Sequence, residues 1–174
     1  MTQADGVSLR RLRRDDERAY LAAVARSVRL HRPWAYPPDT AEAFAEYVAG
    51  STTRIPLVVE ARGELAGIYT FSQIVYGSFR NAYLGYYALE PFAGQGFMRE
   101  GLELVLSYAF GDLRLHRVQA SIQPENERSI GLVRGAGFRR EGLARRYLKI
   151  GGRWRDHEHW AITAEERRDR HRRT

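Results

Sequence analysis

The chain contains no cysteine among its 174 residues. This absence excludes disulfide bonds, a cysteine nucleophile, thiolate metal ligands and an acyl-enzyme formed on cysteine. It also fits a reducing compartment, so we expect the protein to be cytoplasmic. Lysine is scarce too, because Lys149 is the single lysine among the 28 basic residues. Arginine therefore carries nearly all of the positive charge.

Long apolar runs are also missing. No stretch is long enough to span a bilayer, and residues 1–6 lack the apolar core of a signal peptide. We therefore expect no membrane partner. The hydrophobic content of 44% and the charged content of 28% are those of an ordinary globular protein. The length suits a single domain over residues 1–174, with room for a real core.

The net charge of +7 has two compatible explanations. One is a bias toward arginine codons. The other is attraction to a polyanion, such as a coenzyme, an acidic protein face or ribosomal RNA. The end of the chain, from about residue 165 to residue 174, is expected to be a flexible basic tail. Its arginines are Arg167, Arg168, Arg170, Arg172 and Arg173.

The order of the expected elements indicates one mixed α/β layered structure. Alternating apolar residues predict strands at residues 7–12, 55–60, 64–71, 81–89, 116–123, 142–150 and 154–163. Apolar residues three and four apart predict helices at about residues 16–28, 41–49, 96–110 and 126–136. Three prolines keep residues 31–40 out of regular structure, and Thr40 is expected to cap the next helix. Turns are expected at Arg62-Gly63 and Gly151-Gly152, and a left-handed helix end at Gly137.

The segment from Pro91 to Met98 joins an expected strand to an expected helix. Gly94 and Gly96 let the main chain approach a bulky anion, and the helix start adds its dipole and unpaired N–H groups. Arg99 stands where a dinucleotide fingerprint has its third glycine, and the Lys-Ser/Thr of a P-loop is absent. A tight turn without any ligand explains this segment about equally well.

A second motif follows about thirty residues later. Asn126 is a good helix cap, and Ser129 lies one turn into the expected helix. Capping alone explains Asn126, but a cap at the mouth of a crevice can also direct its amide to a ligand. Together the two motifs predict a site for a long phosphorylated carrier, and coenzyme A fits best.

The order strand, glycine turn, helix, strand, capped helix and Gly137-Phe138 resembles the GNAT N-acetyltransferase superfamily. That family has a glycine loop of the form Gln/Arg-x-x-Gly-x-Gly/Ala. Here Gly94 and Gly96 match, and Pro91 replaces the leading residue. The resemblance implies one domain with a mixed, mostly antiparallel sheet of about seven strands. The sheet would splay between its fourth and fifth strands, with about four flanking helices.

Further segments resemble the RimJ/RimL branch, at residues 85–86, 100, 108–110, 115–118, 124–130 and 137–138. Residues 141–142, 147–148 and 152–157 resemble more narrowly the RimJ group, which acetylates the N-terminal alanine of ribosomal protein S5. The match covers about residues 9–163. Tyr83 and Ala93 depart from the pattern, because many relatives have an acidic and a basic residue there.

The resemblance implies acetyl-CoA as cosubstrate and direct attack by an amine, without an acyl-enzyme. It places the diphosphate on the glycine turn, at Ala93, Gly94, Gln95, Gly96, Phe97 and Met98. The pantetheine arm would lie along Tyr87, Ala88 and Leu89, where the strand splays, and would contact Asn126. A main-chain N–H of Ala88 or Leu89 would polarise the thioester carbonyl.

Ser129 is the candidate to protonate the leaving thiolate, although a local helix hydrogen bond explains it equally well. No residue stands out as a general base. Tyr86, Glu90 or Tyr147 could anchor water that carries the proton away. Deprotonating an α-amino group at neutral pH costs about 1 kcal/mol, against roughly 4 to 5 kcal/mol for lysine. A site without a strong base therefore favours an N-terminal amine.

Acceptor recognition is expected to fall to the proline-rich loop and the last hairpin. Trp34, Tyr36, Tyr147 and Trp154 could line a peptide cleft, although packing explains any single one better. A metal site at His157 and His159 would need a third ligand that the sequence does not offer, so we expect no metal.

Three functions remain open, and so does the choice between a monomer and a homodimer. The first is acetylation of the N-terminus of a ribosomal or similar protein. The second is acetylation of a small amine, an aminoglycoside or a peptide antibiotic. The third is a ribosome-associated RNA-binding protein with a vestigial site, motivated by the tail and by Arg10, Arg11, Arg13 and Arg14.

Overall fold

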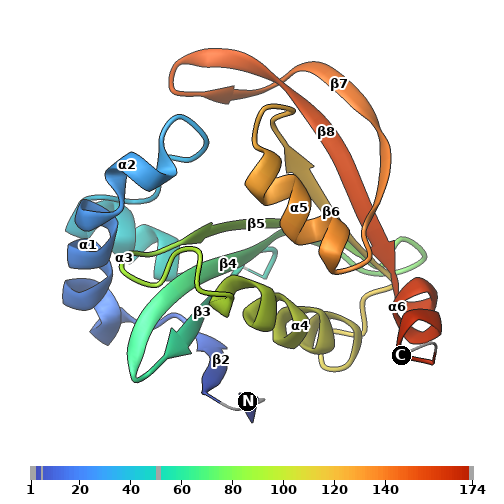
Figure 1. The fold of residues 1–174 in the computed structure, drawn as a ribbon, viewed down its shortest axis with the longest axis horizontal. Coiled ribbons are helices and arrows are strands. Elements are labelled where there is room, and N and C mark those ends of the chain that lie inside the picture. The colour runs from blue at the N-terminus through green and yellow to red at the C-terminus, as the bar shows by residue number, and fades with distance from the viewer. Residues whose placement is uncertain (1–2, 5, 50–51, 173–174) are drawn as a thin grey trace.

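The computed structural model describes residues 3–4, 6–49 and 52–172. Within these ranges the chain forms one eight-stranded sheet, ordered β1-β2-β3-β4-β5-β6-β8-β7, with helices on both faces (Figure 1). Every neighbouring pair of strands is antiparallel except β5 and β6. The expected mixed, mostly antiparallel α/β sheet is therefore confirmed. The strands are β1 (Gln3–Ala4), β2 (Val7–Arg11), β3 (Ile55–Ala61), β4 (Glu64–Val75), β5 (Asn81–Ala88), β6 (Arg117–Ile122), β7 (Arg139–Ile150) and β8 (Arg153–Thr163).

The helices include the four that the sequence predicts and two short ones that it does not, α2 and α6. They are α1 (Glu17–Arg26), α2 (Val28–His31), α3 (Ala41–Ala49), α4 (Phe97–Phe110), α5 (Glu127–Gly135) and α6 (Ala164–His171), with a 3-10 turn at Arg14–Asp16. No helix in the described part of the chain is long and apolar enough to cross a membrane.

The basic tail differs from our expectation, because it is helical as far as His171. The Thr163 hydroxyl accepts a hydrogen bond from the Glu166 N–H, and the Glu166 carboxylate accepts one from the Thr163 N–H. This reciprocal cap satisfies two backbone donors at the helix start. Arg167 then pairs with Glu103 of α4 at 2.9 Å. Cap and ion pair together hold α6 against the body of the protein.

Two apolar clusters lie on the two faces of the sheet. Alternation along β4 sends Ile68 to one cluster and Tyr69 to the other. The Tyr69 side is covered by α4 and α5, and the Ile68 side by α1 and α3 (Figure 1). β5 is the fifth strand in a sheet of eight, and helices cover both faces of that sheet. β5 therefore lies in the middle of the molecule.

The sheet opens between β5 and β6, as the resemblance implies. These parallel strands pair through only three residues of each, Asn81 to Tyr83 with Arg117 to Gln119. Beyond that point β5 continues to Ala88 and β6 to Ile122 without pairing to each other. Figure 1 shows β6 and α5 rising away from β5. One edge of β5 is therefore left open in the centre of the protein.

Candidate active site

A cleft of about 1060 Å³ lies at the opening between β5 and β6. Its walls come from α2 and the loop after it, the end of β5, the glycine turn before α4 and the start of α5. Many residues singled out in the sequence line it. They are Trp34, Tyr86, Tyr87, Ala88, Glu90, Ala93, Gly94, Gly96, Met98, Asn126 and Ser129.

Other predicted residues do not line the cleft. Leu89 is fully buried in the core under α1 and α3. The Gln95 side chain turns back and donates to the Pro91 carbonyl at 2.7 Å. The Phe97 ring packs edge-on against Phe92, with ring centroids 5.7 Å apart. Only the backbone of Phe97 remains available to a ligand.

The glycine turn presents a group of unpaired backbone donors. Gly94 and Gly96 have φ angles of 78° and 93°, and nothing lies within 4 Å of a Cβ built on Gly94. Among the described residues, no acceptor pairs with the N–H of either glycine or of Phe97 and Met98, the first residues of α4. Four unpaired N–H groups therefore lie at a helix start, where an anion such as a diphosphate fits.

The end of β5 offers a second set of main-chain groups. The Leu89 N–H donates to the Ala66 carbonyl of β4 at 2.9 Å, so it cannot also polarise a thioester. Peptide groups alternate between the two sides of a strand in an antiparallel ladder. Because Leu89 pairs toward β4, the N–H and C=O of Ala88 point to the open side. Of the two residues considered from the sequence, only Ala88 has an N–H facing the cleft.

His31 is a cleft residue that the sequence analysis missed. Its Nε2 lies 2.7 Å from the Ala88 carbonyl oxygen, which can only accept, so Nε2 carries the proton. Its Nδ1 is buried and has no partner among the described residues. Burial lowers the pKa of His31, and its ring packs edge-on against Tyr87 at 5.1 Å. A neutral imidazole thus holds the Ala88 peptide, a role that no sequence pattern around His31 indicates.

The lowered pKa of His31 predicts an acid-dependent loss of stability. The unfolded chain takes up a proton at about pH 6.5, whereas the folded chain resists it, so falling pH favours unfolding. Burial lowers the pKa of His157 in the same direction. We expect the free energy of unfolding to drop between about pH 6.5 and about pH 5, before carboxylates protonate. Denaturant unfolding over this range should show a shallower drop for His31→Gln, and an unchanged slope would contradict the assignment.

Ser129 and Tyr86 form a hydrogen-bonded pair across the cleft. The Ser129 hydroxyl donates to the Tyr86 hydroxyl at 2.7 Å, and the Tyr86 hydroxyl lies 3.2 Å from the Ser129 carbonyl oxygen. Asn126 caps α5, because its Oδ1 accepts from the Ser129 N–H at 3.2 Å. Burial raises the pKa of Tyr86. Tyr86 therefore stays protonated at neutral pH.

Glu90 also lines the cleft. Its N–H donates to the buried Ser27 hydroxyl at 2.9 Å, which fixes the backbone where β5 leads into the glycine turn. The negative charge of Glu90 raises the pKa of His31 and so offsets part of the lowering caused by burial. Glu90 is the predicted acidic residue that a water chain could use.

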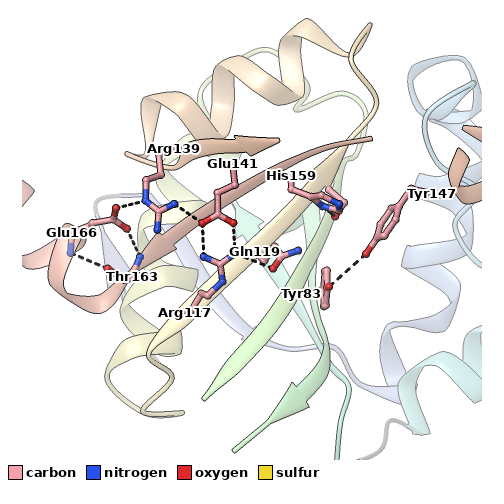
Figure 2. Close-up of polar contacts among 10 residues, drawn as sticks. Tyr83, Arg117, Gln119, Arg139, Glu141, Tyr147, His159, Thr163 and Glu166 are labelled. Carbon is pink, nitrogen blue, oxygen red and sulfur yellow. Dashed lines mark hydrogen bonds and ion pairs between the residues drawn. The ribbon is translucent and has the colours of Figure 1, made fainter. Parts of the chain in front are cut away.

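Of the four predicted acceptor residues, Trp34 alone is among the residues that line the cleft. Tyr147 lies on the inner face of β7 with its hydroxyl directed at Tyr83, 3.5 Å away (Figure 2). Tyr36 is 50% exposed, and Trp154 is 62% exposed. Residues Arg145 to Tyr147 bulge out of register with β8.

The two predicted imidazoles contact neighbouring groups. His159 Nδ1 lies 3.0 Å from the Ser121 hydroxyl, and His157 Nδ1 lies 3.0 Å from the Arg155 carbonyl oxygen. Tyr147 packs against both rings. In the described ranges, no group of three or more His, Cys, Asp or Glu side chains could hold a metal ion.

Comparison with known proteins agrees with this geometry. The family model for the Acetyltransferase (GNAT) domain matches residues 7–139. A solved structure of Mycobacterium smegmatis RimJ in complex with CoA-disulfide is 32% identical. It covers 92% of this chain and 83% of that chain, with a TM-score of 0.85.

Two curated relatives from Escherichia coli differ in their printed activities. The [ribosomal protein uS5]-alanine N-acetyltransferase is 41% identical over 100 residues, 58% of this chain and 52% of the relative. The spermidine N(1)-acetyltransferase is 27% identical over 161 residues, 90% of this chain and 85% of the relative. The match to the first spans about half the length of that relative. The family model and the RimJ structure each span most of the chain, so this chain belongs to the GNAT acetyltransferase family.

Proposed function

We propose that this protein is an acetyl-CoA-dependent N-acetyltransferase that acetylates the N-terminal α-amino group of a protein. One observation carries the proposal. The unpaired N–H groups of the glycine turn and the outward-facing Ala88 peptide open into the same cleft. A molecule with a diphosphate at one end and an amide-bearing arm matches both sets of groups at once.

Coenzyme A has these parts in the right order. Its diphosphate fits the N–H groups at Gly94, Gly96, Phe97 and Met98. Its pantetheine amides can add to the open edge of β5 as an extra strand would, with the Asn126 side chain beside them. The Ala88 N–H is then the donor for the thioester carbonyl.

The proposed chemistry is a direct transfer, as the resemblance to the family implies, and the absence of cysteine is consistent with it. The amine nitrogen attacks the thioester carbon, the carbon–sulfur bond breaks, and the thiolate leaves. The Ser129–Tyr86 pair supplies the proton that the thiolate takes up. The amine loses its proton to water held near Glu90.

Acetylation of a polyamine is the second candidate, since the spermidine N(1)-acetyltransferase relative matches most of this chain. The charge of the cleft argues against it. Arg29, Arg32, Arg99 and Arg128 line the cleft and would repel a polycation, although Glu90, Glu125 and Glu127 offset part of this charge.

RNA binding with a vestigial site has lost part of its support. Arg10, one of the arginines behind that reading, pairs with Asp16 at 2.8 Å and with Glu60 at 2.7 Å. In the tail, Arg167 pairs with Glu103. These guanidinium groups serve the fold, because partly buried arginines with two acceptors are not available to phosphates.

The test incubates the protein and acetyl-CoA with single acceptors and follows free thiol. The acceptors are an unblocked peptide, an N-terminally blocked lysine peptide, spermidine and an aminoglycoside. At neutral pH we expect the unblocked peptide to exceed the lysine peptide in kcat/KM on the order of 100-fold, because far more of its amine is neutral. Preference for spermidine would overturn the acceptor, and no thiol from any amine would overturn the activity.

A further inference from the structure

The inner half of the β7–β8 hairpin has compensated charge. Arg139 and Arg117 both pair with Glu141, and Arg140 pairs with Glu158 at 2.8 Å (Figure 2 shows the first two pairs). The Arg117 guanidinium beside Glu141 lowers the pKa of that carboxyl to about 2. At this end of the hairpin, every arginine named has an acidic partner.

The outer half of the same hairpin, residues 143–156, is different. Its acidic residue, Asp156, accepts a hydrogen bond from the backbone N–H of Arg146 at 2.8 Å. The same segment carries five exposed cations, and none of them forms an ion pair with a carboxylate in the part of the chain that the structure describes. They are Arg145, Arg146, Lys149, Arg153 and Arg155.

Two of these cations share a face with apolar side chains. Cross-strand partners point to the same side of a sheet, and Leu148 opposes Arg155 while Ile150 opposes Arg153. Alternation along β8 places Arg153 and Arg155 on the side of His157, which is buried against Tyr147. We name the side of the hairpin that carries Leu148, Ile150, Arg153 and Arg155 the inner hairpin face. Trp154 lies on the opposite side.

The inner hairpin face adjoins the cleft. Tyr36 fills the space where Gly151 would carry a side chain, so the hairpin tip rests on the loop after α2 (Figure 1). On that loop the Arg32 guanidinium lies 5.0 Å from the centre of the Tyr36 ring, and Arg32 also lines the cleft. Positive charge thus continues from the hairpin tip to the cleft mouth.

We propose that the inner hairpin face docks an acidic polypeptide segment and delivers its N-terminal amine to the cleft. This inference rests on the proposed function for the fate of the amine. Uncompensated arginines around a partner's carboxylates give complementary charge, and Leu148 and Ile150 offer the apolar contact that a peptide side chain uses. A second copy of the chain fits poorly, because β7 is an edge strand and its cations would face one another.

The test compares three peptides with the same length and the same first two residues. The later positions are acidic in one, neutral in the second and arginine-rich in the third, with a fluorophore at each C-terminus. Fluorescence anisotropy gives Kd, and thiol release gives kcat/KM. We expect the acidic peptide to exceed the neutral one about tenfold in both at about 50 mM salt, and less at about 200 mM.

A charge-neutralised double variant locates the effect. Arg153→Gln with Arg155→Gln should reduce the acidic-to-neutral ratio to about twofold or less. The matched control, Arg18→Gln with Arg114→Gln, removes the same charge from exposed residues outside the hairpin and should keep the full ratio. If both double variants reduced the acidic-to-neutral ratio equally, the preference would depend only on the net charge of the protein. That result would overturn the docking surface.

The two measurements separate this inference from the proposed function. Binding of the acidic peptide that depends on Arg153 and Arg155, without thiol release, supports the surface and overturns the activity. Thiol release with no preference among the peptides overturns the surface alone. An RNA oligonucleotide that loses affinity in the double variant, while the acidic peptide does not, would assign this face to nucleic acid instead and overturn the proposal.

Discussion

Replacing Gly96 by aspartate should weaken acetyl-CoA binding on the order of 100-fold relative to replacing it by asparagine. Both side chains are strained by the positive φ of 93° at this position, and because Asn and Asp have nearly the same shape the backbone cost is similar. Only aspartate adds a negative charge beside the N–H groups proposed to hold the diphosphate. At a few ångströms near a protein surface, such repulsion amounts to ~3 kcal/mol. Calorimetric titration with acetyl-CoA measures the difference.

The pair also contains its own control. If Gly96→Asn and Gly96→Asp lose the same affinity for acetyl-CoA, the loss comes from side-chain bulk or backbone strain and not from charge. The diphosphate would then lie elsewhere. Circular dichroism of both variants should match the parent, since a Cβ at Gly96 meets only the Glu100 carboxylate, at 3.9 Å. Raising the ionic strength should narrow the gap between the two variants, because added ions screen the repulsion.

Removing the hydroxyl of Tyr86 should lower kcat on the order of 100-fold, with little change in KM for acetyl-CoA. The reason is that a positioned proton donor contributes at least this much when a thiolate leaves. Tyr86→Phe keeps the ring packed on Tyr69, 5.3 Å away between centroids, so the fold should tolerate it. Steady-state kinetics with the best peptide acceptor tests the prediction.

Ser129→Ala completes a double-mutant cycle. The two hydroxyls are 2.7 Å apart and act as one unit in the proposed transfer, so the double variant should be no slower than the slower single one. If the fold-losses in kcat of the two single variants multiplied in the double variant, the two hydroxyls would act independently. A rise in KM for acetyl-CoA with unchanged kcat would show that they bind the cosubstrate and do not donate the proton.

Local sequence signals predicted the local structure well. Arg62-Gly63 forms its hairpin turn with φ angles of 55° and 80°, and Gly137 ends α5 with a φ of 93°. Thr40 accepts from the Ala43 N–H, as expected of a cap. These outcomes depend on a few neighbouring residues, whose preferences the sequence states directly. The spacing of Thr163 and Glu166 is also typical of a reciprocal helix cap. The basic composition of the tail instead led us to expect a flexible segment.

The cleft was only partly predictable. The glycine turn and Asn126 were found because each is a compact motif with its own backbone geometry. The hydrogen-bonded pair that we propose as proton donor was not visible as a pair, since Tyr86 and Ser129 are 43 residues apart. His31 carries no motif at all, and it meets Ala88 across 57 residues. Such contacts depend on how whole elements pack.

The sequence by itself determined most of the helices and strands and the glycine turn that we propose binds an anion, because strand alternation, caps and glycines act through nearby backbone. Only the tertiary structure decided that Ala88 and not Leu89 has an N–H facing the cleft, and that His31 holds its peptide. It also decided which arginines are paired and which remain exposed on the outer hairpin. The physical reason is that pairing direction, burial and charge compensation are set by neighbours distant along the chain.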